Sequence, residues 1–211
     1  MMRVNVMKTI ASLRPSRFVS NYGKLKLAKE PAEQIHARHF WTYWLNLVSN
    51  KVYQERLEEA GPEQACAEWL IRNGCEIKWT SRDKLQTDYN DMPDMDESTW
   101  IQGIKADNSS IMDIGFEHLK FIKGPEKIIF RRCHYLSDDA LEKLDCIGHS
   151  LRHLQLISCH NVTDEGVCSL TRLRKLKFIK LFDLSSVKDI DSCRQHLQDG
   201  LPECVVDWVK L

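Results

Sequence analysis

Two stretches of the sequence decide the fold: IIFRRCHYLSDDAL at residues 128–141 and LQLISCHNVTDEGV at residues 154–167. They align at an offset of 26 residues, and the offset superimposes three pairs: Cys133 and Cys159, His134 and His160, and Asp138 and Asp164. A third unit follows at an offset of 25 from Ile179, and a weaker unit begins at Ile104. A period of 25–26 residues is typical of leucine-rich repeats. The sequence therefore predicts about four such repeats.

The internal pattern of one repeat predicts which side chains are buried. Leu154 and Leu156 lie two positions apart, so they point to the same face of a strand. Cys159 follows at the inward ladder position, and Cys133 takes that position one repeat earlier. Because a single repeat cannot bury its apolar face, neighbouring repeats must stack. We predict an α/β fold in which residues 79–211 form a short leucine-rich-repeat solenoid, with its last edge strand near the C-terminus.

Residues 30–78 predict a small helical N-terminal domain that caps the repeats. One helix face is marked by apolar residues at helical spacing: Trp41, Trp44, Leu45 and Val48. We expect these aromatic side chains in the core, although an exposed aromatic anchor for a partner is the alternative. A second helix is expected over 53–60 and a third over 63–73, with Pro62 in its first turn.

The N-terminal segment differs sharply in charge from the rest of the chain. Residues 1–29 contain seven Lys or Arg residues and no Asp or Glu. This composition is typical of a mitochondrial transit peptide, since the inner-membrane potential draws positive charge inward. A disordered basic tail is the alternative. The whole chain has a formal net charge of zero, which gives no sign of a nucleic-acid binder.

The sequence contains no recognisable catalytic constellation. Gly-rich phosphate loops and zinc-binding helix motifs are absent, so we expect a non-enzyme. Cys133 and Cys159 each precede a histidine, but adjacent strand residues point to opposite faces and cannot form a thiol–imidazole pair. The outward-pointing His134 and His160 either line a partner-binding face or are solvated. The acidic stretch 88–97 lacks the glycine of a calcium loop.

Several motifs together resemble one known family. They are His39-Phe40-Trp41, Trp44-Leu45-Asn46, Gly61-Pro62, Glu68-Trp69-Leu70 and Cys133-His134-Tyr135. Over roughly residues 38–202 the chain resembles mitochondrial ATP synthase subunit s, also called coupling factor B. The resemblance implies a peripheral protein on the matrix side of the inner membrane that associates with the membrane sector of the F-type ATP synthase. It implies a regulatory or coupling role, in which proton leak is limited, and leaves a homo-oligomer open.

The resemblance also implies a magnesium site and a change in thiol chemistry. The site maps to Gly74, through its carbonyl, and to Asp107, whose carboxylate is a hard oxygen ligand suited to Mg²⁺. A solvated or N-capping Asp107 is the alternative. The family has a Cys-x-Cys pair before His-Tyr, whereas this chain has Arg131 in the first position. Cys133 therefore lacks a vicinal thiol.

Two other functions compete with the coupling factor. A related family with similar repeats assembles the membrane arm of respiratory complex I. Cytosolic substrate adaptors for ubiquitin ligation use cysteine-containing leucine-rich repeats, but they require an F-box, which this sequence does not show.

Overall fold

The computed structural model describes the backbone of residues 32–209 and the side chains from Trp41 onward. The predicted transit peptide at residues 1–29 lies outside the described residues. Contacts divide the chain into two units, Met1–Phe40 and Trp41–Leu211. Helix α2, Ala32–Asn50, belongs to both units.

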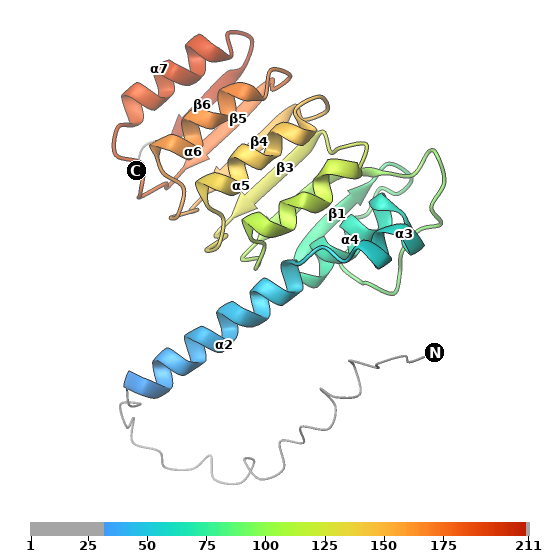
Figure 1. Cartoon of the computed structure of the whole chain (residues 1–211). Helices are drawn as coiled ribbons and strands as arrows, with labels where there is room; N and C mark the ends of the chain where they lie inside the picture. The colour runs from blue at the N-terminus through green and yellow to red at the C-terminus, as the bar shows by residue number, and fades with distance from the viewer. Residues whose placement is uncertain (1–31, 210–211) are drawn as a thin grey trace. The chain divides into compact units, whose positions relative to one another are not determined.

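A six-stranded mixed sheet forms the centre of the second unit (Figure 1). Its strands follow one another in space as they do in sequence: β1 Cys75–Trp79, β2 Ile101–Asp107, β3 Lys127–Arg131, β4 His153–Ile157, β5 Phe178–Phe182 and β6 Val205–Val209. Strand β1 is antiparallel to β2, and every later pair is parallel. Parallel neighbours need a crossover between them, which explains the helical segment between successive strands.

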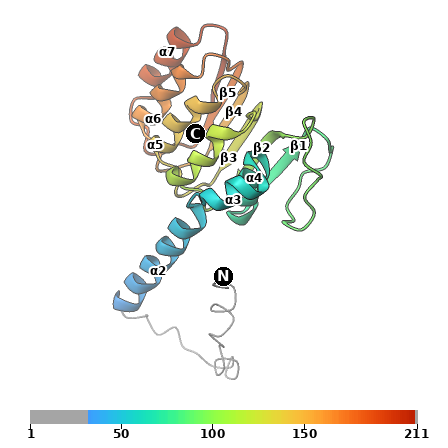
Figure 2. The same ribbon diagram turned by 45° about the vertical axis from the view of Figure 1, so that its right-hand side comes forward.

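The helical segments lie along one face of the sheet (Figure 2). They are α3 Gln54–Ala60, α4 Pro62–Arg72, the 3-10 helix η1 Asp113–Phe121, α5 Asp138–Lys143 with η2 Leu144–Ile147, α6 Asp164–Ser169 with η3 Leu170–Arg172, and α7 Ile190–Gly200. The opposite face of β3–β6 carries no second layer within the described residues. One surface of the sheet therefore remains open to solvent.

The sheet register reproduces the sequence repeat. Ile128 pairs with Leu154, and Leu154 pairs with Ile179, at sequence differences of 26 and 25 residues. All three side chains are fully buried. Because strand side chains alternate with a period of two, this register carries the apolar set of every repeat to the helix-covered face. The predicted alignment of the repeats is therefore the hydrogen-bonded register of the sheet.

A repeated aspartate ties each helix start to the next repeat. The carboxylate of Asp138 accepts hydrogen bonds from the backbone N–H and hydroxyl of Thr163, at 2.8 and 2.7 Å. One repeat later, Asp164 accepts from the backbone N–H groups of Lys188 and Asp189, at 3.0 and 2.8 Å. The aspartates satisfy backbone donors that the turns would otherwise leave unpaired.

The helices and the sheet share one core. The Trp69 ring of α4 lies 6.0 Å from that of Phe116 in η1, which lies 6.1 Å from Phe130 in β3. A Cβ atom at Gly115 would stand 2.5 Å from the Trp69 indole nitrogen, so this close approach requires glycine. The described helical region is thus continuous with the repeats rather than a separate core.

Two sequence interpretations differ from the structure. Residues 75–78 were expected at the end of a helical region, but they belong to β1, where buried and half-buried side chains alternate. Gly74, at a φ of 83°, ends α4 and allows the change of direction. The expectation that Trp41 and Trp44 are core residues is wrong, since they are 60% and 46% exposed. By contrast, Trp69 is buried.

Candidate partner-binding surfaces

The second half of α2 carries an exposed apolar surface. We call it the α2 aromatic face, and it consists of Trp41, Trp44, Leu45 and Val48, which share one side of the helix. The rings of Trp41 and Trp44 meet edge to face, with centroids 6.0 Å apart. Contiguous apolar surface of this kind marks interaction sites, and Trp and Tyr are enriched among the residues that dominate binding energy.

The base of this helix is fixed by a buried polar hub at Asn50. The Asn50 amide nitrogen donates to Asn73 Oδ1 at 3.1 Å and to the Ser110 carbonyl at 2.8 Å. Its Oδ1 accepts from Trp69 Nε1 at 3.0 Å and from the Met112 backbone N–H at 2.8 Å. These bonds join α2, α4 and the segment after β2 through one side chain. Residues 41–50 are therefore anchored to the core at their C-terminal end.

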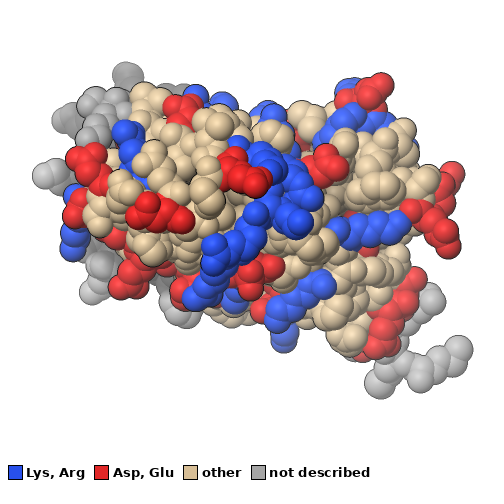
Figure 3. All heavy atoms as spheres, turned by 90° about the horizontal axis from the view of Figure 1, so that it is seen from above, with Lys and Arg blue, Asp and Glu red and all other residues tan. Residues whose placement is uncertain are grey.

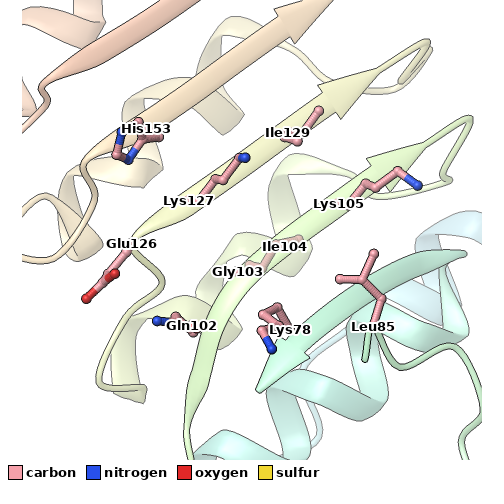
Figure 4. A pocket seen from close by; sticks show the side chains of 10 residues that line it. All are labelled: Lys78, Leu85, Gln102, Gly103, Ile104, Lys105, Glu126, Lys127, Ile129 and His153. Atoms are coloured by element: carbon pink, nitrogen blue, oxygen red, sulfur yellow. The ribbon is translucent and has the colours of Figure 1, made fainter. Parts of the chain in front are cut away.

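The open sheet face holds a second candidate surface, a shallow pocket of about 380 Å³. Figure 4 shows Lys127 and Ile129 projecting from β3 beside His153 of β4. Lys105, on β2, is already paired with Glu76 at 2.8 Å. Lys127 makes no ion pair with another described residue. The pocket combines an apolar floor with the Lys127 ammonium group, which has no ion-pair partner among the described residues. This combination suits a peptide side chain better than a reacting substrate.

Charge is mixed over the molecular surface. The face shown in Figure 3 carries a band of Lys and Arg side chains flanked by Asp and Glu. A nucleic-acid binder presents a continuous basic surface, which this face does not. Among the described residues, no helix has the length and apolar content needed to cross a membrane.

Comparison with known proteins identifies relatives that share one name. No protein-family model matches it. A mouse protein named mitochondrial ATP synthase subunit s is 41% identical over 170 residues, which cover 79% of this chain and 84% of the mouse protein. The human protein of that name is 38% identical over the same shares. This chain belongs to the ATP synthase subunit s family.

A more distant relative has a different name. A Drosophila melanogaster protein named distal membrane arm assembly component 2 is 22% identical over 153 residues. The match covers 70% of this chain but about half of the fly protein.

The ladder cysteines occupy equivalent buried positions. Cys133 and Cys159 are both fully buried, and each Sγ lies 3.5 Å from the carbonyl two residues earlier. The Ser109 hydroxyl lies 3.3 Å from Cys133 Sγ, so Ser109 extends the ladder toward β1. In the sequence, Ser109 follows the strand of the weakest repeat. The two cysteines mark their repeats more clearly, so Ser109 was not recognised as a ladder residue.

The predicted partner histidines lie at the ends of β3 and β4. His134 and His160 are both exposed in the turns that follow these strands, and His160 Nδ1 is 2.9 Å from the Ser185 hydroxyl. The pocket of Figure 4 lies near the opposite ends of these strands, at Lys127 and His153. The two histidines do not line it, and their role as a partner face stays a prediction.

The predicted magnesium ligands, Gly74 and Asp107, lie close together, but the Asp107 carboxylate is already bound by two arginine side chains. Cys75 pairs with Ala106, so Gly74 and Asp107 are the next residues along that ladder. Asp107 Oδ1 accepts from Arg132 at 2.7 Å, and Oδ2 lies 3.5 Å from the Arg131 guanidinium. Two guanidinium groups neutralise the carboxylate, so this donor set does not fit a divalent ion while both remain in place. Within the described part of the chain, no cluster of three His, Cys, Asp or Glu suits a metal.

Sequence reasoning missed a buried histidine beside the hub. The His118 side chain stacks on the Trp69 indole, with centroids 5.1 Å apart and an interplanar angle of 11°. Neither of its ring nitrogens has a hydrogen-bond partner among the described residues. Burial lowers the pKa of His118 to about 4, so the ring is neutral at neutral pH and packs as an aromatic. The sequence of the 3-10 helix that carries His118 contains no pattern that predicts the burial of this side chain.

Proposed function

We propose that this protein is a mitochondrial, non-enzymatic accessory subunit of the F-type ATP synthase. In this proposal it associates with the membrane sector from the matrix side of the inner membrane and supports ATP synthesis by limiting proton leak. Identity of 38–41% to proteins named mitochondrial ATP synthase subunit s, over most of both chains, supports the assignment. The structural observation that carries it is the α2 aromatic face.

The α2 aromatic face supplies the contact in this proposal. Trp44 and Leu45 are 46% and 57% exposed on an element whose end is fixed by Asn50. A preorganised apolar surface loses little conformational freedom on binding, so its burial contributes efficiently to affinity. The partner surface would be apolar, as at the exposed parts of a membrane-sector subunit. Truncation of an anchoring Trp in such an interface typically costs about 2 kcal/mol or more.

We further infer that the strand–helix units are leucine-rich repeats in a short α/β solenoid, capped by α3 and α4. The register at 25–26 residues and the buried Cys133 and Cys159 support this assignment. Such a solenoid holds its helices and strands in a fixed order. In this proposal it presents binding surfaces and does not catalyse a reaction.

Affinity purification from mitochondria tests the proposal. The tagged full chain should co-purify ATP synthase subunits, and the Trp41→Ala/Trp44→Ala variant should lose them. The matched control is Phe121→Ala on η1, which removes an aromatic of 57% exposure outside α2 and should retain them. Retention by the double variant would reject the α2 aromatic face as the contact. If no ATP synthase subunit co-purifies with the unaltered chain, the proposed partner is wrong.

Assembly of the membrane arm of complex I is the second candidate. It rests on the 22% identity to the fly protein named distal membrane arm assembly component 2. The same purification separates the two candidates, because recovery of complex I arm subunits without ATP synthase would favour this one.

Measuring proton leak in membranes depleted of the chain tests the coupling role. The leak should rise on depletion and fall again when the chain is added back. Sedimentation of the purified chain tests the predicted homo-oligomer.

A further inference from the structure

Two thiols on neighbouring helices lie close to each other. Cys168 is on α6 and Cys193 is on α7, separated by one repeat period of 25 residues. Their Sγ atoms are 4.0 Å apart. The sulfur–sulfur bond of a disulfide is about 2.05 Å long, so rotation of the two side chains must bring the sulfur atoms closer together. The repeat geometry itself therefore places two thiols face to face.

The two thiols differ in environment. Cys193 is buried, and its Sγ lies 3.5 Å from Asp164 Oδ1. Burial, together with the neighbouring Cys168 thiol and the Asp164 carboxylate, raises the pKa of Cys193 to about 12. Cys168 is partly exposed. A dissolved reagent therefore meets Cys168 first, while Cys193 stays protonated behind it.

The other cysteines do not offer the same arrangement. The side chains of Cys133 and Cys159 also interact with each other, but both are fully buried and closed to solvent. Cys146 is partly exposed, but the thiol with which it interacts electrostatically, Cys66, is fully buried, and no hydrogen bond joins the two among the described residues. Cys146 is therefore a matched single thiol against which the pair can be compared.

We propose that Cys168 and Cys193 form a peroxide-reactive dithiol that closes to a disulfide between α6 and α7. The Cys168 thiolate attacks hydrogen peroxide, an S–O bond forms, the O–O bond breaks, and the departing hydroxide takes up a proton as water. The Cys193 sulfur then attacks the Cys168 sulfenic acid, an S–S bond forms and the S–O bond breaks. The second hydroxide takes up the Cys193 proton. Two thiols are thus oxidised by two electrons, and one peroxide is reduced to two waters.

The disulfide would link two successive repeats covalently. A cross-link restricts the unfolded chain and so favours the folded state when the native geometry tolerates it. Oxidation would therefore raise the melting temperature of the chain. This inference does not depend on the proposed function, because it concerns α6 and α7 and not the α2 aromatic face.

Peptide mapping of the peroxide-treated full chain tests the dithiol. The reduced protein is treated with equimolar hydrogen peroxide and digested without reductant. A cross-linked Cys168–Cys193 peptide is expected from the wild type and from Cys146→Ser, and it should be absent from Cys168→Ser. A bifunctional alkylating probe, dibromobimane, fluoresces when it bridges two thiols and reports the pair without any core substitution.

Two results would overturn the proposal. One is recovery of Cys168 as a free thiol or as a sulfinic acid with no cross-linked peptide, since Cys193 would then not resolve the sulfenic acid. The other is a cross-linked peptide that joins Cys168 to a cysteine other than Cys193 after equimolar peroxide.

Discussion

The repeat body, β3 to β6, and the second half of α2 both carry a regular apolar pattern, yet they use it in opposite ways. In the repeats, side chains such as Leu154 and Leu156 are fully buried. In α2, Trp41 and Leu45 are 60% and 57% exposed. The difference teaches that periodicity identifies a common face of an element but does not say what covers it. Stacked repeats cover each other, whereas the α2 aromatic face is left for a partner in our proposal.

The largest expected effect comes from placing a charge in each region. Cys159→Arg should abolish folding, because a fully buried unpaired guanidinium loses its hydration without compensation. Trp44→Arg should fold with nearly unchanged stability, since Trp44 is half exposed. Circular dichroism and urea unfolding measure both. A soluble, equally stable Cys159→Arg protein would show that the ladder register is wrong. The milder Cys159→Ala should cost roughly 1–2 kcal/mol through lost packing.

The junction of the two regions is expected to be nearly as sensitive. Asn50→Ala removes Oδ1, the single acceptor for both Trp69 Nε1–H and the Met112 backbone N–H, and leaves two buried donors unpaired. Each unsatisfied group typically costs about 1–3 kcal/mol, so we expect a loss of about 2–5 kcal/mol in the free energy of unfolding. Ser49→Ala, at the partly buried neighbouring position, is the control and should cost less. Equal losses in the two variants would contradict the central role of Asn50.

A pH titration sharpens the comparison at the same junction. The pKa of His118 is about 4 in the folded chain and about 6.5 when unfolded. Between these values the unfolded chain binds a proton that the folded chain does not, so stability should fall as pH drops from about 6.5 to about 4. The shift corresponds to at most about 3–4 kcal/mol. His118→Phe should remove this part of the loss, as measured by urea unfolding at several pH values. Parallel pH profiles for the variant and the wild type would exclude it.

The smallest effect is expected from magnesium. Because Arg131 and Arg132 hold Asp107, millimolar Mg²⁺ should raise the unfolding free energy of the wild type by less than about 0.5 kcal/mol. The Arg131→Gln/Arg132→Gln variant should gain more, and Asp107→Ala should gain nothing. Thermal melts with and without Mg²⁺ measure this. A clear wild-type rise that Asp107→Ala abolishes would instead establish the predicted site at Gly74 and Asp107 despite the arginines.

Much of this protein was determined by the sequence alone. The match at an offset of 26 residues between 128–141 and 154–167 predicted the strand register and the burial of Cys133 and Cys159, and the apolar stretch near the C-terminus predicted the final strand. The motifs around Trp69 led to the subunit s family, which the relatives confirm. Repeats and motifs are local or periodic properties of the chain, so they can be read without coordinates.

Only the tertiary structure decided which surfaces and pairs result. It placed residues 75–79 in β1, exposed Trp41, paired Asp107 with two arginines, buried His118 without a polar partner and brought Cys168 to Cys193. Each of these features depends on a tertiary contact between segments that are far apart in the sequence. Solvent cover, ionic partners and thiol contacts are set by those contacts, because the local pattern of a chain fixes where a side chain points but not what it will face.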